Sequence, residues 1–184
     1  MNHTLKHAAT AVLLLTSIDM FAQKKAGSQQ KDNFLMIKGV VVDDGDKLEG
    51  VNIRLFKGNN IVDSVYTDSE GSFKFALGKD DYYAIEYTRV GYENTSVLIN
   101  TNRWDVEPQD ENNGYQVDFE VDLIPEIPNK NQLKLSKDDT DVLDFPKVLI
   151  GYKSGEDEGF FSDKKYVKST RESLKKIKDA AKGK

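Results

Sequence analysis

The chain has 184 residues and a formal net charge of −5, and it contains no cysteine and only two histidines. The lack of cysteine excludes disulfides, a thiol nucleophile and thiolate metal sites. His3 and His7 both lie in the first 22 residues, so a chain without that segment also lacks the imidazole that Ser-His-Asp and Cys-His catalysis require. We therefore expect a protein that is not an enzyme and uses no metal or cofactor.

Residues 1–22 have the pattern of a signal peptide. Lys6 supplies the positive charge, residues 8–18 form an apolar run, and Ala22 offers a small residue before a cleavage point at Gln23. The run is too short to cross ~30 Å of hydrocarbon, so we predict export without a transmembrane span; the alternative is a buried N-terminal helix. Residues 23–34 are polar and are predicted to form a flexible leader.

From residue 35 onward, apolar and polar side chains alternate with the period of two that is typical of half-buried strands. Seven such segments are separated by turn residues, and they cover residues 35–42, 51–55, 61–67, 73–77, 82–90, 95–99 and 115–123. This spacing predicts an all-β fold, a seven-stranded β-sandwich over residues 35–124. We expect no parallel sheet, because no strand-helix-strand spacing occurs, and we expect a long loop over residues 101–114.

Residues 125–161 are predicted to be an extended linker. Residues 129–144 are polar and read as irregular, a short strand is expected around Val148, Ile150 and Tyr152, and Gly155 and Gly159 are expected to bracket a turn.

Residues 162–182 are predicted to form a basic amphipathic helix, capped by Ser162. Its apolar stripe is expected to comprise Val167, Thr170, Leu174, Ile177 and Ala181. Three roles stay open for this helix: docking on its own sandwich, peripheral contact with an anionic membrane surface, or binding of a partner.

Residues 37–100 resemble the carboxypeptidase regulatory-like, transthyretin-like β-sandwich domain that is common in gram-negative envelope proteins. The most specific string is Thr67-Asp68-Ser69-Glu70-Gly71-Ser72-Phe73. The positions that carry the resemblance are Gly39, Gly50, Thr67, Asp68, Gly71, Phe73, Gly91 and Tyr92. The resemblance implies a structural or binding module without its own catalysis.

The residues of the string have physical roles of their own. Asp68 is expected to accept hydrogen bonds from backbone N–H groups that follow it, and Gly71 to adopt a positive φ in the turn. Phe73 should then begin the next strand with its ring pointing inward. Gly50 and Gly91 are expected at a bulge or at a close approach of two backbones.

Two segments are the candidate partner-binding surfaces. Arg103 and Trp104 are residue types that often anchor interfaces, and the alternative for Trp104 is a lid over the open end of the sandwich. The second surface is the basic helix, represented by Lys168, Arg171, Lys175 and Lys178. Residues 163–184 hold nine basic and three acidic residues, whereas residues 105–122 hold seven acidic and no basic ones. This asymmetry favours protein contacts or self-docking over a nucleic-acid surface.

Three further patterns have a chemical and a structural interpretation. Asp118, Glu120 and Asp122 on one strand face suggest either a glycan-cleaving carboxylate pair or calcium ligands, or a solvated face. Asp43, Asp44 and Asp46 around a glycine suggest a calcium loop or a hairpin turn. The tyrosines at 82, 83, 87 and 92 suggest sugar stacking or core packing.

Together these patterns predict a non-catalytic binding or accessory protein of the periplasm or outer membrane, with secretion as a further destination. Its partner is expected to be another envelope protein and not a nucleic acid. The alternatives are a structural subunit of a secretion or surface-assembly complex and a carboxylate-dependent glycan hydrolase. The sequence does not indicate an oligomeric state.

Overall fold

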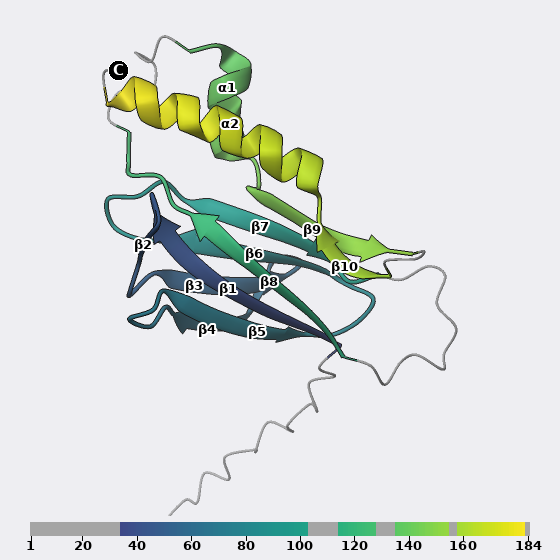
Figure 1. Cartoon of the computed structure of the whole chain (residues 1–184). Helices are drawn as coiled ribbons and strands as arrows, with labels where there is room; N and C mark the ends of the chain where they lie inside the picture. Colours follow the sequence, from purple (N-terminus) through teal and green to yellow (C-terminus); the bar gives the residue numbers. More distant parts are fainter. Residues whose placement is uncertain (1–33, 103–113, 128–134, 155–157, 183–184) are drawn as a thin grey trace, which may run out of the picture.

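The computed structural model describes residues 34–102, 114–127, 135–154 and 158–182. Two β-sheets pack face to face, and a long C-terminal helix, α2 (Lys164–Ala181), lies along one side of them (Figure 1). The predicted β-sandwich is therefore confirmed, and all seven predicted strands are present.

The first sheet is built around β1 (Leu35–Asp43), which pairs with three other strands. Antiparallel partners are the short β2 (Asp46–Lys47) and β5 (Ser72–Leu77), whereas β8 (Tyr115–Asp122) runs parallel to β1. The expectation of no parallel pairing is wrong, because β8 arrives from the other sheet after a long connection. Such a connection permits a parallel neighbour without an intervening helix.

The second sheet has six strands in the order β10-β9-β7-β6-β3-β4. Their bounds are β3 (Asn52–Lys57), β4 (Asn60–Tyr66), β6 (Tyr82–Thr88), β7 (Thr95–Asn100), β9 (Val148–Lys153) and β10 (Gly159–Ser162). β9 pairs parallel to β7, with Val148 opposite Val97. The C-terminal extension thus enlarges the second sheet by two strands.

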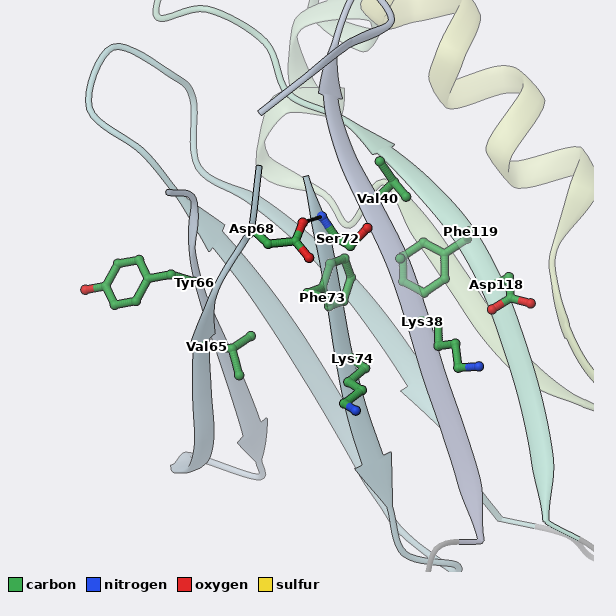
Figure 2. Close-up of a pocket in the computed structure, with 11 residues that line it drawn as sticks. Lys38, Val40, Val65, Tyr66, Asp68, Ser72, Phe73, Lys74, Asp118 and Phe119 are labelled. Atoms are coloured by element: carbon green, nitrogen blue, oxygen red, sulfur yellow. Dashed lines mark hydrogen bonds between the residues drawn. The ribbon is translucent and has the colours of Figure 1, made fainter. Parts of the chain in front are cut away.

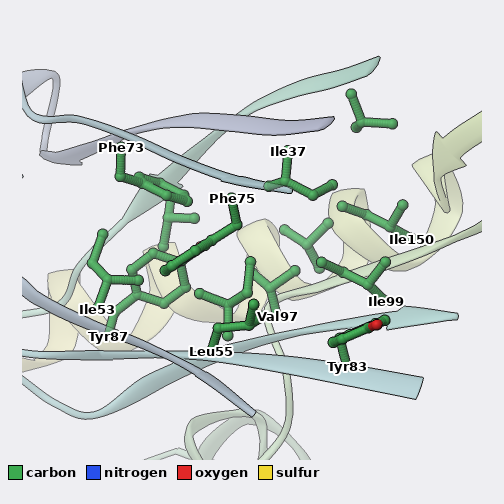
Figure 3. Packing of buried hydrophobic residues seen from close by; sticks show 14 of the residues in the cluster. Ile37, Ile53, Leu55, Phe73, Phe75, Tyr83, Tyr87, Val97, Ile99 and Ile150 are labelled. Atoms are coloured by element: carbon green, nitrogen blue, oxygen red, sulfur yellow. The ribbon is translucent and has the colours of Figure 1, made fainter. Parts of the chain in front are cut away.

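The core lies between the two sheets, where the alternating apolar side chains meet. Ile37 and Phe75 of the first sheet face Leu55, Tyr87 and Val97 of the second (Figure 3). Tyr83, Ile85 and Tyr87 are buried, which confirms core packing for these residues of β6. Complete burial raises the pKa of the Tyr87 hydroxyl well above its ordinary value of 10.0.

The segment between β8 and α2 is more ordered than the sequence suggested. A short helix α1 (Lys137–Asp141) and a 3-10 helix η3 (Val142–Asp144) occupy part of the region expected to be irregular. The short strand expected around Ile150 is present as β9. Gly159 begins β10 opposite Lys153 of the antiparallel β9, at the end of the segment where a turn was expected, and Gly155 lies outside the described residues. Phe160 packs its ring edge-on against Phe34 and Tyr115.

The predicted C-terminal helix is present, and its cap is shifted by one residue. Ser162 ends β10, and the Asp163 side chain accepts the capping hydrogen bond from the Tyr166 N–H at 3.0 Å. Leu174 and Ile177 of α2 pack on Ile124 and Ile127, which follow β8. The helix therefore docks on its own chain, one of the three roles considered for it. None of the described helices is long and apolar enough to cross a membrane.

We expect Thr67→Val to lower the free energy of unfolding by about 2 kcal/mol. The buried Thr67 hydroxyl accepts from the Val51 N–H at 2.9 Å and donates to the Leu48 carbonyl at 2.6 Å. Valine has the same shape as threonine but can make neither of these hydrogen bonds. Urea unfolding measures the change. Thr88→Val is the matched control, because the half-buried Thr88 hydroxyl makes one bond of 3.3 Å; equal losses in the two variants would contradict this role of Thr67.

Candidate functional site

The residues of the family-like string build the turn between β4 and β5. The Asp68 carboxylate accepts from the backbone N–H groups of Glu70 at 3.0 Å and Ser72 at 2.8 Å, as predicted. Gly71 has φ of +68° and Phe73 is buried, which confirms both expectations. The string is therefore a structural device that fixes where β5 begins.

The other family-like positions are also structural. A side chain at Gly39 would begin 2.4 Å from the Phe73 ring, which lies across this glycine. The Tyr92 hydroxyl donates to Asp43 at 3.1 Å. Gly50 and Gly91 have φ of +74° and +82° and nothing within 4 Å of the place where a side chain would begin, so their backbone conformation, and not lack of space, favours glycine.

Arg103 and Trp104 lie outside the described residues, so their binding role stays a prediction. The other predicted binding residues belong to a stripe of cations along α2. Its members recur at alternating intervals of four and three residues, the spacing that keeps side chains on one side of a helix. They are Lys164, Lys168, Arg171, Lys175, Lys178 and Lys182. We call this set the cationic stripe.

The C-terminal end of the cationic stripe is neutralised within the chain. The Lys178 ammonium lies 2.9 Å from carboxylate oxygens of Asp44 and Asp122 and 3.6 Å from Asp43. Lys182 binds the second oxygen of Asp44 at 3.0 Å. We call these five residues the carboxylate clamp. The Lys178 side chain is only 9% exposed, so its expected role in partner binding is corrected: it holds the helix on the sandwich.

The clamp shifts the pKa values of two of its members, Asp44 and Lys178. Hydrogen bonds from Lys178 and Lys182 lower the pKa of Asp44 from 3.8 to about 2. Burial by itself would lower the pKa of Lys178, but the hydrogen bonds and charges of Asp44 and Asp122 outweigh that effect and raise it above 10.5. Asp44 and Lys178 are therefore both charged at neutral pH.

The acidic patterns seen in the sequence divide between the clamp and solvent. Asp43, Asp44 and Asp122 are close enough together to hold a metal ion, but the Lys178 ammonium contacts all three. Asp43 and Asp46 face each other across the β1–β2 hairpin, which supports the turn interpretation. Asp118 and Glu120 remain exposed on β8, whereas Asp122, the third carboxylate of that pattern, belongs to the clamp.

A cleft of about 350 Å³ runs between the stripe and the sandwich. Its apolar surface comes from Val121, Val148, Val167 and Leu174. Arg171 and Lys175 stand on the helix side of the cleft and Glu120 on the β8 side. The cleft can therefore take an apolar side chain between charged groups.

A larger groove of about 740 Å³ is lined by residues of β1, β4, β5 and β8 (Figure 2). Lys74, Lys38 and Asp118 form one row across it, because Lys38 is opposite both of the others in the strand register. Asp118 also accepts a hydrogen bond from the Gln116 side chain at 2.8 Å. The groove places two ammonium groups beside the apolar side chains of Val40, Val65 and Phe119.

We expect Asp44 to titrate near pH 2. Because its pKa is lower when folded, the stability that it contributes is present above about pH 4 and is lost as the pH falls towards 2. Carboxyl-carbon NMR should show this midpoint in the native protein and a midpoint nearer 3.8 in Lys182→Met. Lys153→Met, which removes a lysine outside the clamp, should leave the midpoint unchanged; a native midpoint near 3.8 would contradict the clamp.

Comparison with known proteins gives a family match over part of the chain. Residues 36–121 match the carboxypeptidase regulatory-like domain. A search of curated protein sequences finds no relative.

Among solved structures, the Bacillus anthracis TIE protein is 20% identical with a TM-score of 0.40, over 50% of this chain and 17% of that one. A streptococcal ancillary pilin is 17% identical with a TM-score of 0.34, over 48% and 31%. Acinetobacter radioresistens catechol 1,2-dioxygenase is 15% identical with a TM-score of 0.38, over 55% and 55%. The chain spans less than two thirds of each, and likenesses this weak carry no argument about function.

Proposed function

We propose that the chain is a non-catalytic accessory protein that binds a protein partner, because residues 36–121 match the carboxypeptidase regulatory-like domain. We place it in the periplasm or at the outer membrane, after removal of residues 1–22. The sandwich is the scaffold, and the outward side of α2 is the contact surface. Arg103 and Trp104 are proposed to add to the same contact.

One observation carries this proposal: α2 is docked on the sandwich, and three of its cations nevertheless stay exposed. Ile124 and Ile127 cover the apolar side of the helix, and the clamp fixes the C-terminal end of the helix. Lys168, Arg171 and Lys175 remain exposed on this fixed helix. A rigid element that presents side chains in fixed positions loses less entropy on binding than a mobile tail.

Site-specific photo-crosslinking in intact cells tests the proposal. A photoreactive residue in place of Lys168 should capture a defined protein, identified by mass spectrometry, because this position faces outward from the docked helix. The matched control places the same residue at Tyr66, which is 71% exposed on β4. Capture of the same proteins at both positions, or of none at position 168, would show that the helix is not the contact surface.

A hydrolysis assay tests the alternative from the sequence. Asp118 and Glu120 are the two carboxylates of that pattern left outside the clamp. If purified protein cleaves a glycan and Asp118→Asn with Glu120→Gln abolishes cleavage while the fold is intact, the accessory role is wrong.

A further inference from the structure

The cationic stripe on α2 is divided into two halves with different surroundings. Lys178 and Lys182 bind the carboxylates of the clamp. Lys164, Lys168, Arg171 and Lys175 are exposed and make no ion pair with any residue in the described part of the chain. We call these four the open half of the stripe. Four uncompensated cations in one row create a local positive potential on a protein whose net charge is −5.

We propose that the open half of the stripe binds an extended, acidic segment of a partner protein. This inference rests on the proposed function and adds the chemistry of the partner. The clamp is an example of a carboxylate bound to this stripe. Both carboxylate oxygens of Asp122, at the end of β8, lie 2.9 and 3.0 Å from the Lys178 ammonium. A partner carboxylate would meet Lys175, one turn from Lys178, or Arg171, two turns from it, in the same manner.

The dimensions of the stripe favour an extended occupant. Lys164 and Lys175 are eleven residues apart, so the open half is about 16 Å long at 1.5 Å per residue. Alternate side chains of an extended chain project on one side every ~6.6 Å, so three acidic side chains at alternate positions match this length. β8 carries that pattern in Asp118, Glu120 and Asp122.

The cleft beside the open half supplies a second contact. Its apolar surface, from Val121, Val148, Val167 and Leu174, lies next to Arg171 and Lys175. An apolar side chain between two acidic ones could enter the cleft while its neighbours meet the cations. The occupant therefore combines acidic and apolar residues in alternation.

Two other anionic partners fit the described surface less well. Insertion into a membrane interface needs the apolar side of the helix, but Thr170, Leu174 and Ile177 are buried against the chain itself. A nucleic-acid backbone has no apolar side chain to place beside Val121, Val148 and Leu174, so it would leave the contact with the cleft unused.

Fluorescence anisotropy with a labelled peptide tests the inference. The probe is Gly-Glu-Val-Glu-Val-Glu-Gly, and its lysine counterpart is the charge control. The full chain should bind the glutamate peptide, more weakly as salt rises, and not the lysine peptide. The variant Lys168→Glu, Arg171→Glu, Lys175→Glu should bind it at least 30-fold more weakly.

The matched control is Lys38→Glu, Lys74→Glu, Lys153→Glu, which changes the net charge equally with exposed residues outside α2. It should change the affinity by less than threefold. If the helix variant does not fold, alanine replacements at the same three positions serve instead, with circular dichroism as the check.

Several results would overturn the inference. One is the absence of binding to the glutamate peptide, and another is an equal loss of affinity for that peptide in the two triple variants. A third is tighter binding to phosphatidylglycerol vesicles or duplex DNA than to the peptide. The photo-crosslinking result at position 168 is independent of these outcomes. Partner capture at that position without peptide binding would keep the proposed function and reject an acidic segment as the ligand.

Discussion

Replacing Lys178 by methionine is expected to lower the free energy of unfolding by about 2–3 kcal/mol. The substitution keeps the length of the side chain but leaves Asp43, Asp44 and Asp122 facing one another without a cation among them. Loss of one partner from a buried ion pair typically costs about 3–5 kcal/mol, and the part-exposed carboxylates reduce that cost. Urea unfolding at pH 7 and low salt measures the change.

Lys182→Met provides the matched control in the same clamp. The Lys182 side chain is 54% exposed and forms an ion pair with Asp44 and with no other residue in the described part of the chain, so its loss should have an effect below about 1 kcal/mol. The Lys178→Met penalty should shrink as the pH falls towards 2, because protonation of Asp44 removes an ion pair that the substitution breaks. Equal penalties for the two variants, or a Lys178→Met penalty that does not change with pH, would mean that the clamp does not fix the helix.

Gly71→Ala is expected to cost about 3 kcal/mol, through two separate effects. A positive φ is unfavourable by roughly 1–2 kcal/mol for a residue with a side chain, and Gly71 has φ of +68°. The added methyl group would also lie 2.6 Å from the Val41 carbonyl oxygen and 3.2 Å from the Leu48 nitrogen. Those two backbone atoms are hydrogen-bonded to each other at 2.9 Å, so neither can move freely.

Gly58→Ala separates the two effects. Gly58 has φ of +58° in the turn between β3 and β4, and nothing lies within 4 Å of the place where its side chain would begin. This variant carries the conformational cost alone and should lose about 1 kcal/mol. The difference between the two melting curves then measures the crowding at Gly71. If both variants lose the same stability, Gly71 does not lie against the Val41 carbonyl oxygen as the structure places it.

Much of the sandwich could be predicted from local pattern. In β8, Val117 and Val121 are buried and Asp118 and Glu120 exposed, as the alternation of the sequence indicates. The turn at Asp68 and Gly71 was likewise predictable, because its chemistry involves neighbours within four residues. Such features depend on residues close together in the chain, and a single sequence contains them.

Features that depend on distant residues were not predictable in this way. The sequence places Lys178 on the same side of a helix as Lys168 and Lys175, and only the position of Asp44 and Asp122 makes it a buried partner. The parallel pairing of β8 with β1 is of the same kind, since alternation indicates which side of a strand is buried and not which neighbour it joins. β10 was missed because Phe160 and Phe161 are adjacent, so four residues show no alternation.

The joining of the first and last parts of the chain has a consequence for how the protein matures. β1 remains incomplete until β8 emerges, with Leu35 beside Tyr115, and the clamp needs Lys178, 134 residues after Asp44. If the protein is exported from its N-terminus, as we propose, β8 cannot join β1 until residue 122 has crossed the membrane. The clamp can form only after Lys178 has followed.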